Sequence, residues 1–179
     1  MATTKRRANA GSAQLRRLYI DCRFGQLHLT TAYPPNGGFD ECTPLVFLHA
    51  EGGTGADFNR CAALLGIDRS VYAPDLPGSG ASDLNAGRAT VAGHAGAIAD
   101  LFDQLQLKEA DLIGFGRGAA IAFELAASRP QDVRRLIVTG EHAAASSKPL
   151  LLLDADAARL AQGPVDAVVT AIRSFLDRD

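Results

Sequence analysis

The spacing of apolar and polar positions changes several times along the chain, and these changes predict its elements. Short apolar runs bounded by glycine or proline are typical of strands. The N-terminal part predicts two such strands joined by a turn at Phe24-Gly25. The predicted strands span residues 17–22, 26–33, 44–49, 70–76, 110–116, 133–140 and 148–156.

Segments with apolar residues at every third or fourth position separate the later strands and indicate helices. Thr90 stands at the start of one such segment, where its hydroxyl would cap a helix. Pro130 ends another, because proline disfavours helical geometry in the residue before it. The predicted helices span residues 56–66, 90–107, 117–130 and 163–179.

The order of these elements predicts an α/β fold. Strands such as "PLVFLH" are apolar without alternation, which indicates that both faces of the sheet are covered. A hairpin followed by alternating strands and helices predicts an N-terminal β-hairpin, a mostly parallel sheet and helices on both faces. We predict one domain over residues 17–179, preceded by a disordered lead over 1–16. Ligands of such sheets bind beyond the carboxyl ends of the strands.

Composition narrows the class of protein. The chain has 179 residues, 47% of them hydrophobic and 21% charged, with a formal net charge of -2, which argues against disorder and against nucleic-acid or anionic-membrane binding. No apolar run approaches the roughly 18 residues that span a bilayer, and none follows the basic start as in a signal peptide. Cys22, Cys42 and Cys61 fit neither a metal motif nor a disulfide framework, so we expect a reduced, cytoplasmic protein.

Four segments, in this order, resemble the α/β-hydrolase superfamily. "PLVFLHAEGGTGADF" is similar to its strand and oxyanion loop, and "VYAPDLPGSGASD" to its next strand and turn. "DLIGFGRGAAIAFELAASRPQDVRRLIVTG" is similar to the nucleophile elbow with its helix and following strand, and "GPVDAVVTAIRSFLD" to the last helix. The resemblance covers most of the chain after about residue 17 and implies the fold, while the site must decide the activity.

The chain departs from that family where the chemistry belongs. The family motif is G-x-S-x-G, but here Gly116 stands between Gly114 and Gly118 at the nucleophile position. Glycine carries no nucleophile, which excludes acyl-enzyme chemistry at this position. No histidine follows His142, and only "EHAAASSK" stands where the family inserts a helical cap. The chain therefore resembles a reduced form without nucleophile, cap or C-terminal catalytic histidine.

The residues that remain at the strand ends predict a ligand site. Backbone N–H groups near Ala50 and Arg117 are expected to form a cradle for a small carboxylate or carbonyl ligand, with the Arg117 charge beside it. The candidate ligand-binding residues are His49, Ala50, Gly116, Arg117 and Glu141, and the candidate catalytic residues are Glu51 and His142. His142 has an ordinary pKa near 6.5 and would exchange protons near neutrality.

Several of these polar residues also have structural interpretations. His49 would bond the loop backbone, and Glu51 would be a solvated loop carboxylate. Without a histidine partner, Asp154 and Asp156 are expected to be turn or cap residues. The turn after the fourth strand is expected to be shaped by Asp75 and Ser79, His94 to pack within its helix, and His28 has no partner in the sequence.

Four hypotheses about function stay open at this point. The first is a non-hydrolytic small-molecule-binding or accessory protein that uses no metal or cofactor. The second is an unconventional hydrolase or lyase for a small ester or carbonyl substrate, with Glu51 or His142 as a base acting through water. The third is an NAD-type module, because residues 114–119 fit G-x-G-x-x-A and Glu141 ends the next strand. The fourth is self-association through the apolar run "PLLLLDA" as an exposed edge strand, giving a homodimer.

Overall fold

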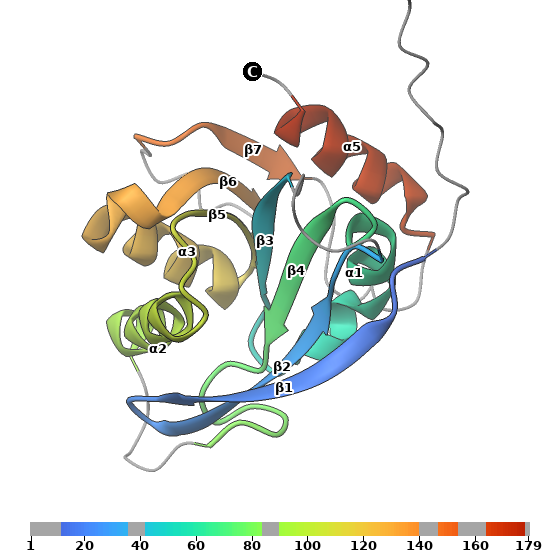
Figure 1. Cartoon of the computed structure of the whole chain (residues 1–179). Helices are drawn as coiled ribbons and strands as arrows, with labels where there is room; N and C mark the ends of the chain where they lie inside the picture. The colour runs from blue at the N-terminus through green and yellow to red at the C-terminus, as the bar shows by residue number, and fades with distance from the viewer. Residues whose placement is uncertain (1–11, 36–41, 84–89, 140–146, 154–163, 178–179) are drawn as a thin grey trace, which may run out of the picture.

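The computed structural model describes residues 12–35, 42–83, 90–139, 147–153 and 164–177. Within them, seven strands form one sheet in the order β1-β2-β4-β3-β5-β6-β7 (Figure 1). The strands are β1 (Leu15–Cys22), β2 (Gly25–Ala32), β3 (Cys42–Leu48), β4 (Arg69–Pro74), β5 (Ala110–Phe115), β6 (Val133–Thr139) and β7 (Leu150–Leu153). Each of them corresponds to a strand predicted from the sequence.

The pairing directions also follow the prediction. β1 and β2 form an antiparallel hairpin, and β2 pairs antiparallel with β4. The remaining pairs, β3–β4, β3–β5, β5–β6 and β6–β7, are parallel. The sheet is therefore mostly parallel, and the ends of β3 and β5 lie side by side at its centre.

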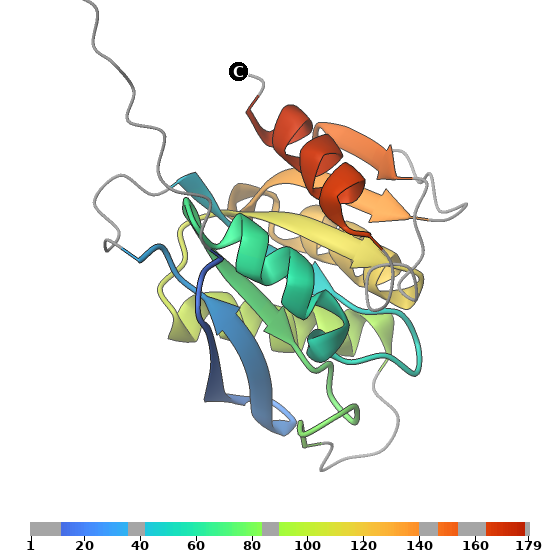
Figure 2. The ribbon, with the colours of Figure 1, turned by 90° about the vertical axis from the view of Figure 1, so that its right-hand side faces the viewer.

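Helices cover both faces of the sheet, as predicted. They are η1 (Gly55–Phe58), α1 (Asn59–Leu65), α2 (Val91–Gln104), α3 (Arg117–Ser128), η2 (Pro130–Asp132) and α5 (Asp166–Leu176). Figure 2 shows α1 and α5 in front of the sheet, with α2 and α3 behind it. The alternation along β3 explains two cores: Val46 and Leu48 pack toward α2 and α3, whereas Leu45 and Phe47 pack toward α1 and α5.

The helix ends confirm the predicted signals. The Thr90 hydroxyl accepts a hydrogen bond from the Gly93 N–H at 3.0 Å and caps α2. α3 ends at Ser128, and Pro130 begins the short helix η2. Both residues act locally, through a hydroxyl acceptor and a restricted backbone, so the sequence alone was sufficient to place them.

Some predicted boundaries were wrong by a few residues. β1 begins at Leu15, and Ala13 is already buried with its N–H bonded to the Ala63 carbonyl at 2.7 Å, so the ordered domain starts before residue 17. Residues 1–11 of the predicted lead lie outside the described residues. β7 covers only Leu150–Leu153, and α5 begins at Asp166 rather than at residue 163. The local pattern of apolar residues could not predict these boundaries. It contains no information about the long-range contact of Ala13 or about the conformational entropy lost when the ends of an element are ordered.

β7 is the edge strand of the described sheet, and Leu152 on it is 54% exposed. Self-association through this edge stays a prediction. Among the described residues, no helical cap stands between β6 and β7, although residues 140–146 are not described. No helix within the described ranges is long and apolar enough to cross a membrane.

Candidate ligand site at the glycine elbow

Gly116 forms the tip of a sharp turn between β5 and α3. Its backbone angles are φ 51° and ψ -115°, and α3 begins at the next residue, Arg117. Residues other than glycine seldom adopt a positive φ, and they do so under strain. The sequence predicted a strand-to-helix elbow here, and the backbone has the strained geometry in which an elbow presents its central residue.

The glycines on either side of the tip allow α3 to approach the sheet closely. A Cβ on Gly118 would lie 2.1 Å from the Leu48 carbonyl oxygen, and one on Gly114 would lie 2.6 Å from the Ala119 Cα. Real Cβ atoms do not approach backbone so closely. A Cβ on Gly116 would instead lie 3.3 Å from the Ala50 Cβ. The flanking glycines thus serve packing, and the tip faces the loop that follows β3.

His49 fixes the position of that loop. The Leu76 N–H donates to His49 Nε2 at 2.9 Å, so the ring proton lies on Nδ1, which donates to the Ala50 carbonyl at 2.7 Å. The side chain is buried, and this burial lowers the pKa of His49 below its usual range. Both ring nitrogens are used on backbone groups. The contacts agree with the structural interpretation of His49, and its candidate role in ligand binding stays a prediction.

Ala50, Gly116 and Arg117 therefore meet at the carboxyl ends of β3 and β5. Arg117 is the first residue of α3, where amide N–H groups have no acceptor within the helix and the dipole favours negative charge. A pocket of about 310 Å³ opens at this point. The residues that line it are His49, Ala50, Glu51, Gly52, Leu76, Pro77, Gly78, Ser79, His94 and Arg117.

Glu51 and Arg117 form an ion pair across the pocket. The Glu51 Oε1 lies 3.8 Å from the Arg117 Nη1, and the two side chains are 76% and 29% exposed. Such a long, solvent-screened pair contributes roughly 0 to 1 kcal/mol. The contact nevertheless shows that the Arg117 guanidinium is placed where a carboxylate can reach it. Glu51 lies at the pocket as predicted, and its proposed role as a base stays a hypothesis.

His94 was missed as a pocket residue. It is buried in the first turn of α2, with Nδ1 2.8 Å from the Thr90 carbonyl and Nε2 3.3 Å from the Pro77 carbonyl. Both neighbours accept hydrogen bonds, so a neutral ring donates to only one of them at a time. The helical pattern suggested packing, which is correct, but the ring also lines the pocket. The sequence did contain a signal for this. His94 lies one turn after the predicted start of α2, and that start faces the carboxyl ends of the strands.

Asp75 has the structural role that the sequence predicted. Its Oδ1 accepts the Gly55 N–H at 2.8 Å, and its Oδ2 accepts the Ala81 N–H at 2.9 Å. The same Oδ2 lies 2.9 Å from His28 Nδ1, a contact between residues 47 positions apart. Asp75 thus ties β2, η1 and the turn after β4 together directly behind the pocket wall.

The other candidates lie in parts of the chain that the structure does not describe. These are Glu141 and His142 after β6 and the two carboxylates Asp154 and Asp156 after β7. Whether any of them reaches the pocket remains a prediction. Of the candidate catalytic residues, Glu51 is the one that lies within the described part of the chain, and it lines the pocket.

A family model described as the alpha/beta hydrolase fold matches residues 43–168, which is more than half of the chain. The chain therefore belongs to the α/β-hydrolase family. This assignment explains the glycine motif at residues 114–119 as an elbow and does not favour a dinucleotide-binding module.

Curated relatives of the chain include a hydrolase. The chain is 32% identical over 118 residues to 2-hydroxymuconate semialdehyde hydrolase of a Pseudomonas species, which covers 62% of this chain and 39% of the relative. It is also 32% identical over 94 residues to an uncharacterized protein of Mycobacterium tuberculosis, covering 52% of this chain and 28% of that protein. The chain thus spans well under half of the curated relatives that it matches.

Solved structures show the same relationship. N-acyl homoserine lactonase AidH in complex with N-butanoyl homoserine has a TM-score of 0.61 at 27% identity, covering 70% of this chain and 44% of the lactonase. A serine-to-glycine mutant of that lactonase, in complex with N-hexanoyl homoserine lactone, gives the same score and identity over 70% and 45%. A mutant of a putative epoxide hydrolase from Pseudomonas aeruginosa has a TM-score of 0.63 at 25% identity, over 74% and 43%.

Proposed function

We propose that this protein binds a small carbonyl or carboxylate compound in the elbow pocket without forming an acyl-enzyme. The observation that carries the proposal is Gly116 at the tip of the strand-to-helix elbow, where φ is 51° and a Cβ would face Ala50. Glycine has no side chain and therefore no nucleophile that could attack a carbonyl carbon. The backbone that would stabilise an oxyanion does not depend on that missing side chain.

The charges and donors around the tip favour an oxygen-rich, negatively polarised group. The Ala50 and Arg117 amides lie on the two segments that meet at Gly116, and the helix dipole of α3 adds positive potential. The Arg117 guanidinium already has a carboxylate, that of Glu51, at 3.8 Å. A ligand carboxylate would displace this weak contact and gain the backbone donors as well.

The solved relatives support the same class of ligand. The lactonase was solved with N-butanoyl homoserine, which carries a carboxylate, and its serine-to-glycine mutant was solved with an acylated lactone. A protein of this fold in which a serine is replaced by glycine therefore holds a carbonyl compound. The present chain is about a quarter identical to it and has glycine at its elbow without mutation.

The binding proposal is tested by calorimetric titration with N-hexanoyl homoserine lactone and with its ring-opened acid. We expect saturable binding of both, and we expect Arg117→Gln to weaken binding of the acid about tenfold and of the neutral lactone less, because only the acid pairs with the guanidinium. Arg60→Gln, an exposed arginine on α1 that does not line the pocket, is the matched control. Equal affinities in wild type and Arg117→Gln would contradict the proposed anion contact.

A second candidate function is hydrolysis by a water molecule that Glu51 or His142 activates. Glu51 favours it because this carboxylate lines the pocket. Hydrolysis of short p-nitrophenyl esters by wild type, Glu51→Gln and His142→Asn separates the two proposals. Turnover by wild type that either substitution abolishes would replace the binding proposal by this one, whereas an inert wild type supports binding alone.

A further inference from the structure

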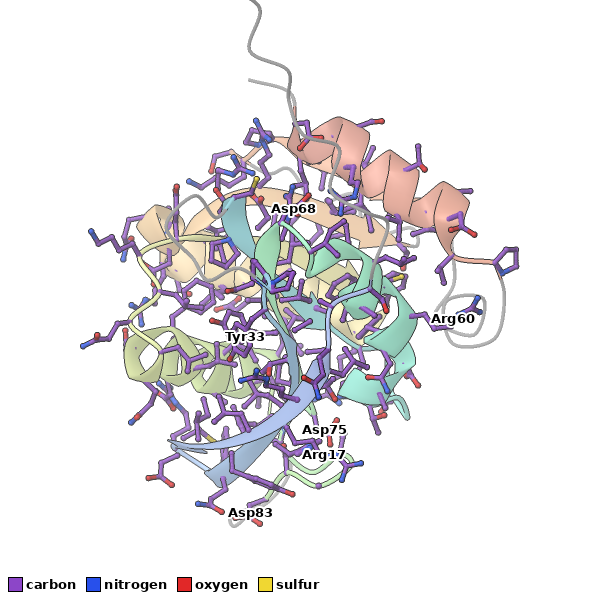
Figure 3. The ribbon with its side chains drawn as sticks, turned by 45° about the vertical axis from the view of Figure 1, so that its right-hand side comes forward. Arg17, Tyr33, Arg60, Asp68, Asp75 and Asp83 are labelled. Atoms are coloured by element: carbon purple, nitrogen blue, oxygen red, sulfur yellow. The ribbon has the colours of Figure 1, made fainter. Side chains whose placement is uncertain are left out.

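A second cavity, of about 470 Å³, lies on the face of the β1–β2 hairpin that is turned toward η1 and α1. We call it the hairpin groove. Its lining residues are Leu15, Arg16, Arg17, Tyr19, His28, Thr30, Ala56, Asn59 and Ala81, none of which lines the elbow pocket. Figure 3 shows Arg17 and Asp75 beside the hairpin, and Arg60 well away from them on α1. The two cavities therefore share no lining residue.

The strand register explains why polar side chains gather in the hairpin groove. Tyr19 pairs with His28 and Arg17 pairs with Thr30, so these four residues form two neighbouring rungs on one face. The Tyr19 and His28 rings are 5.0 Å apart between centroids. An arginine, a phenol, an imidazole and a hydroxyl thus share one concave surface.

The Asp75 carboxylate holds the imidazole of the hairpin groove by one ring nitrogen. It is 6% exposed and also accepts two backbone N–H groups, so the contact of 2.9 Å to His28 Nδ1 requires the ring to donate. The neutral ring consequently has its lone pair on Nε2. No described residue forms a hydrogen bond with Nε2, and the His28 side chain is 13% exposed. In its neutral form the ring therefore presents an acceptor at the wall of the cavity.

Arg17 and His28 lie on the same face of the hairpin. Arg17 and His28 are diagonal neighbours across the antiparallel pair, which places their Cβ atoms about 7 Å apart. No ion pair within 4 Å involves the Arg17 guanidinium among the described residues. The exposed Tyr19 ring lies on the same face, directly across from His28.

From this arrangement we propose that the hairpin groove is a second binding site, for a small aromatic hydroxycarboxylate. The carboxylate pairs with Arg17, the ring packs against Tyr19, and the hydroxyl donates to His28 Nε2. The inference does not depend on the function proposed for the elbow pocket, because it uses none of the residues that line that pocket.

The test is calorimetric titration of the full chain with 4-hydroxybenzoate. We expect saturable millimolar or tighter binding, and about tenfold weaker binding by Arg17→Gln, which removes the charge-assisted contact. Arg60→Gln is the matched control and should bind like wild type. The titrations are repeated in the Arg117→Gln background, where the anion contact of the elbow pocket is removed and the effect of Arg17→Gln should persist. Benzoate, which lacks the hydroxyl, should bind wild type several-fold more weakly than 4-hydroxybenzoate.

Two results would overturn the proposal. One is the absence of saturable binding by wild type up to about 10 mM 4-hydroxybenzoate, which corresponds to a negligible affinity. The other is unchanged affinity in Arg17→Gln, or a loss caused only by Arg117→Gln, which would assign the bound molecule to the elbow pocket. Arg17 is exposed, so its substitution leaves the core intact, and the benzoate comparison tests the His28 contact without altering the protein.

Discussion

The side chains of His49 and His28 form hydrogen bonds with two adjacent residues just after β4, Leu76 and Asp75. They nevertheless provide the two cavities with different chemical groups. His49 uses both ring nitrogens on backbone groups of its own loop and of Leu76, and it is almost completely buried. His28 uses one nitrogen on Asp75, while the other forms no hydrogen bond with a described residue. The elbow pocket therefore contributes mainly backbone and Arg117, whereas the hairpin groove contributes side chains. In this hydrolase fold, the glycine elbow lies at one cavity, whereas the ring nitrogen that forms no hydrogen bond with a described residue, His28 Nε2, lies at the other.

The largest effect should come from breaking the packing of the elbow. Gly118→Ala would force a Cβ to within 2.1 Å of the Leu48 carbonyl oxygen, and we expect a loss of about 3 kcal/mol in the free energy of unfolding. Gly52→Ala is the control, because a Cβ there meets nothing within 4 Å and only its φ of 77° opposes the change, at a cost of about 1 kcal/mol. Urea unfolding measures both, and equal losses would show that close packing does not shape the elbow.

On the hairpin side, Asp75→Asn should lower the free energy of unfolding by about 2 kcal/mol. In wild type, the Asp75 carboxylate accepts hydrogen bonds from several donors, among them the buried Gly55 N–H. The asparagine amide would place an NH₂ group against one of these donors and leave it without an acceptor. The control is Asp83→Asn, at an exposed carboxylate that accepts the Gln26 N–H, with an expected loss below about 1 kcal/mol. A loss no larger than that of the control would mean that Asp75 does not hold these segments together.

The buried His49 predicts how stability depends on pH. Its folded-state pKa is lowered by burial, so the unfolded chain binds more protons below the ordinary histidine pKa of about 6.5. The contribution of neutral His49 to the free energy of unfolding is constant above that pH and is lost as the pH falls toward the lower pKa of the folded state. The loss is about 1.4 kcal/mol for each pKa unit between the unfolded and the folded state. The drop in unfolding free energy from about pH 7.5 to about pH 5.5 should be smaller in His49→Asn than in wild type. An identical drop would show that His49 does not carry the effect.

The smallest effect should come from Gly116→Ser. The backbone already has elbow geometry, and a Cβ would meet Ala50 at 3.3 Å, so we expect a cost of about 1 kcal/mol from the positive φ alone. We also expect no hydrolysis of p-nitrophenyl acetate above the buffer rate, because the two imidazoles that line the described pocket, His49 and His94, have both ring nitrogens within hydrogen-bond distance of backbone groups. Burst release of p-nitrophenol by this variant would show that a base exists and would contradict that expectation.

The fold was predictable from the sequence because its signals are local. Unbroken apolar runs gave the central strands, and Thr90 and Pro130 marked helix ends through their own hydroxyl and ring. The elbow was also predictable, because three closely spaced glycines between a strand and a helix indicate a tight turn with close backbone packing. The early start of β1 was not, because the buried contact of Ala13 is made with a segment about fifty residues away.

The sites were only partly predictable, because they depend on register and crossover. Ala50, Glu51, Gly116 and Arg117 were expected at one sheet edge, and the structure brings these four together. His28 was left without a partner, since its bond to Asp75 arises from the antiparallel pairing of β2 with β4. The sequence contains both residues but no local pattern that connects them across 47 positions.

The central claim is that the elbow pocket binds a carbonyl compound and does not cleave it. The most direct measurement is proton NMR of N-hexanoyl homoserine lactone mixed with the wild-type protein, which reports binding and ring opening in the same sample. The account predicts saturable broadening of the ligand signals while the lactone persists as long as in buffer. Ring opening faster than in buffer, or signals unchanged by the protein, would contradict it.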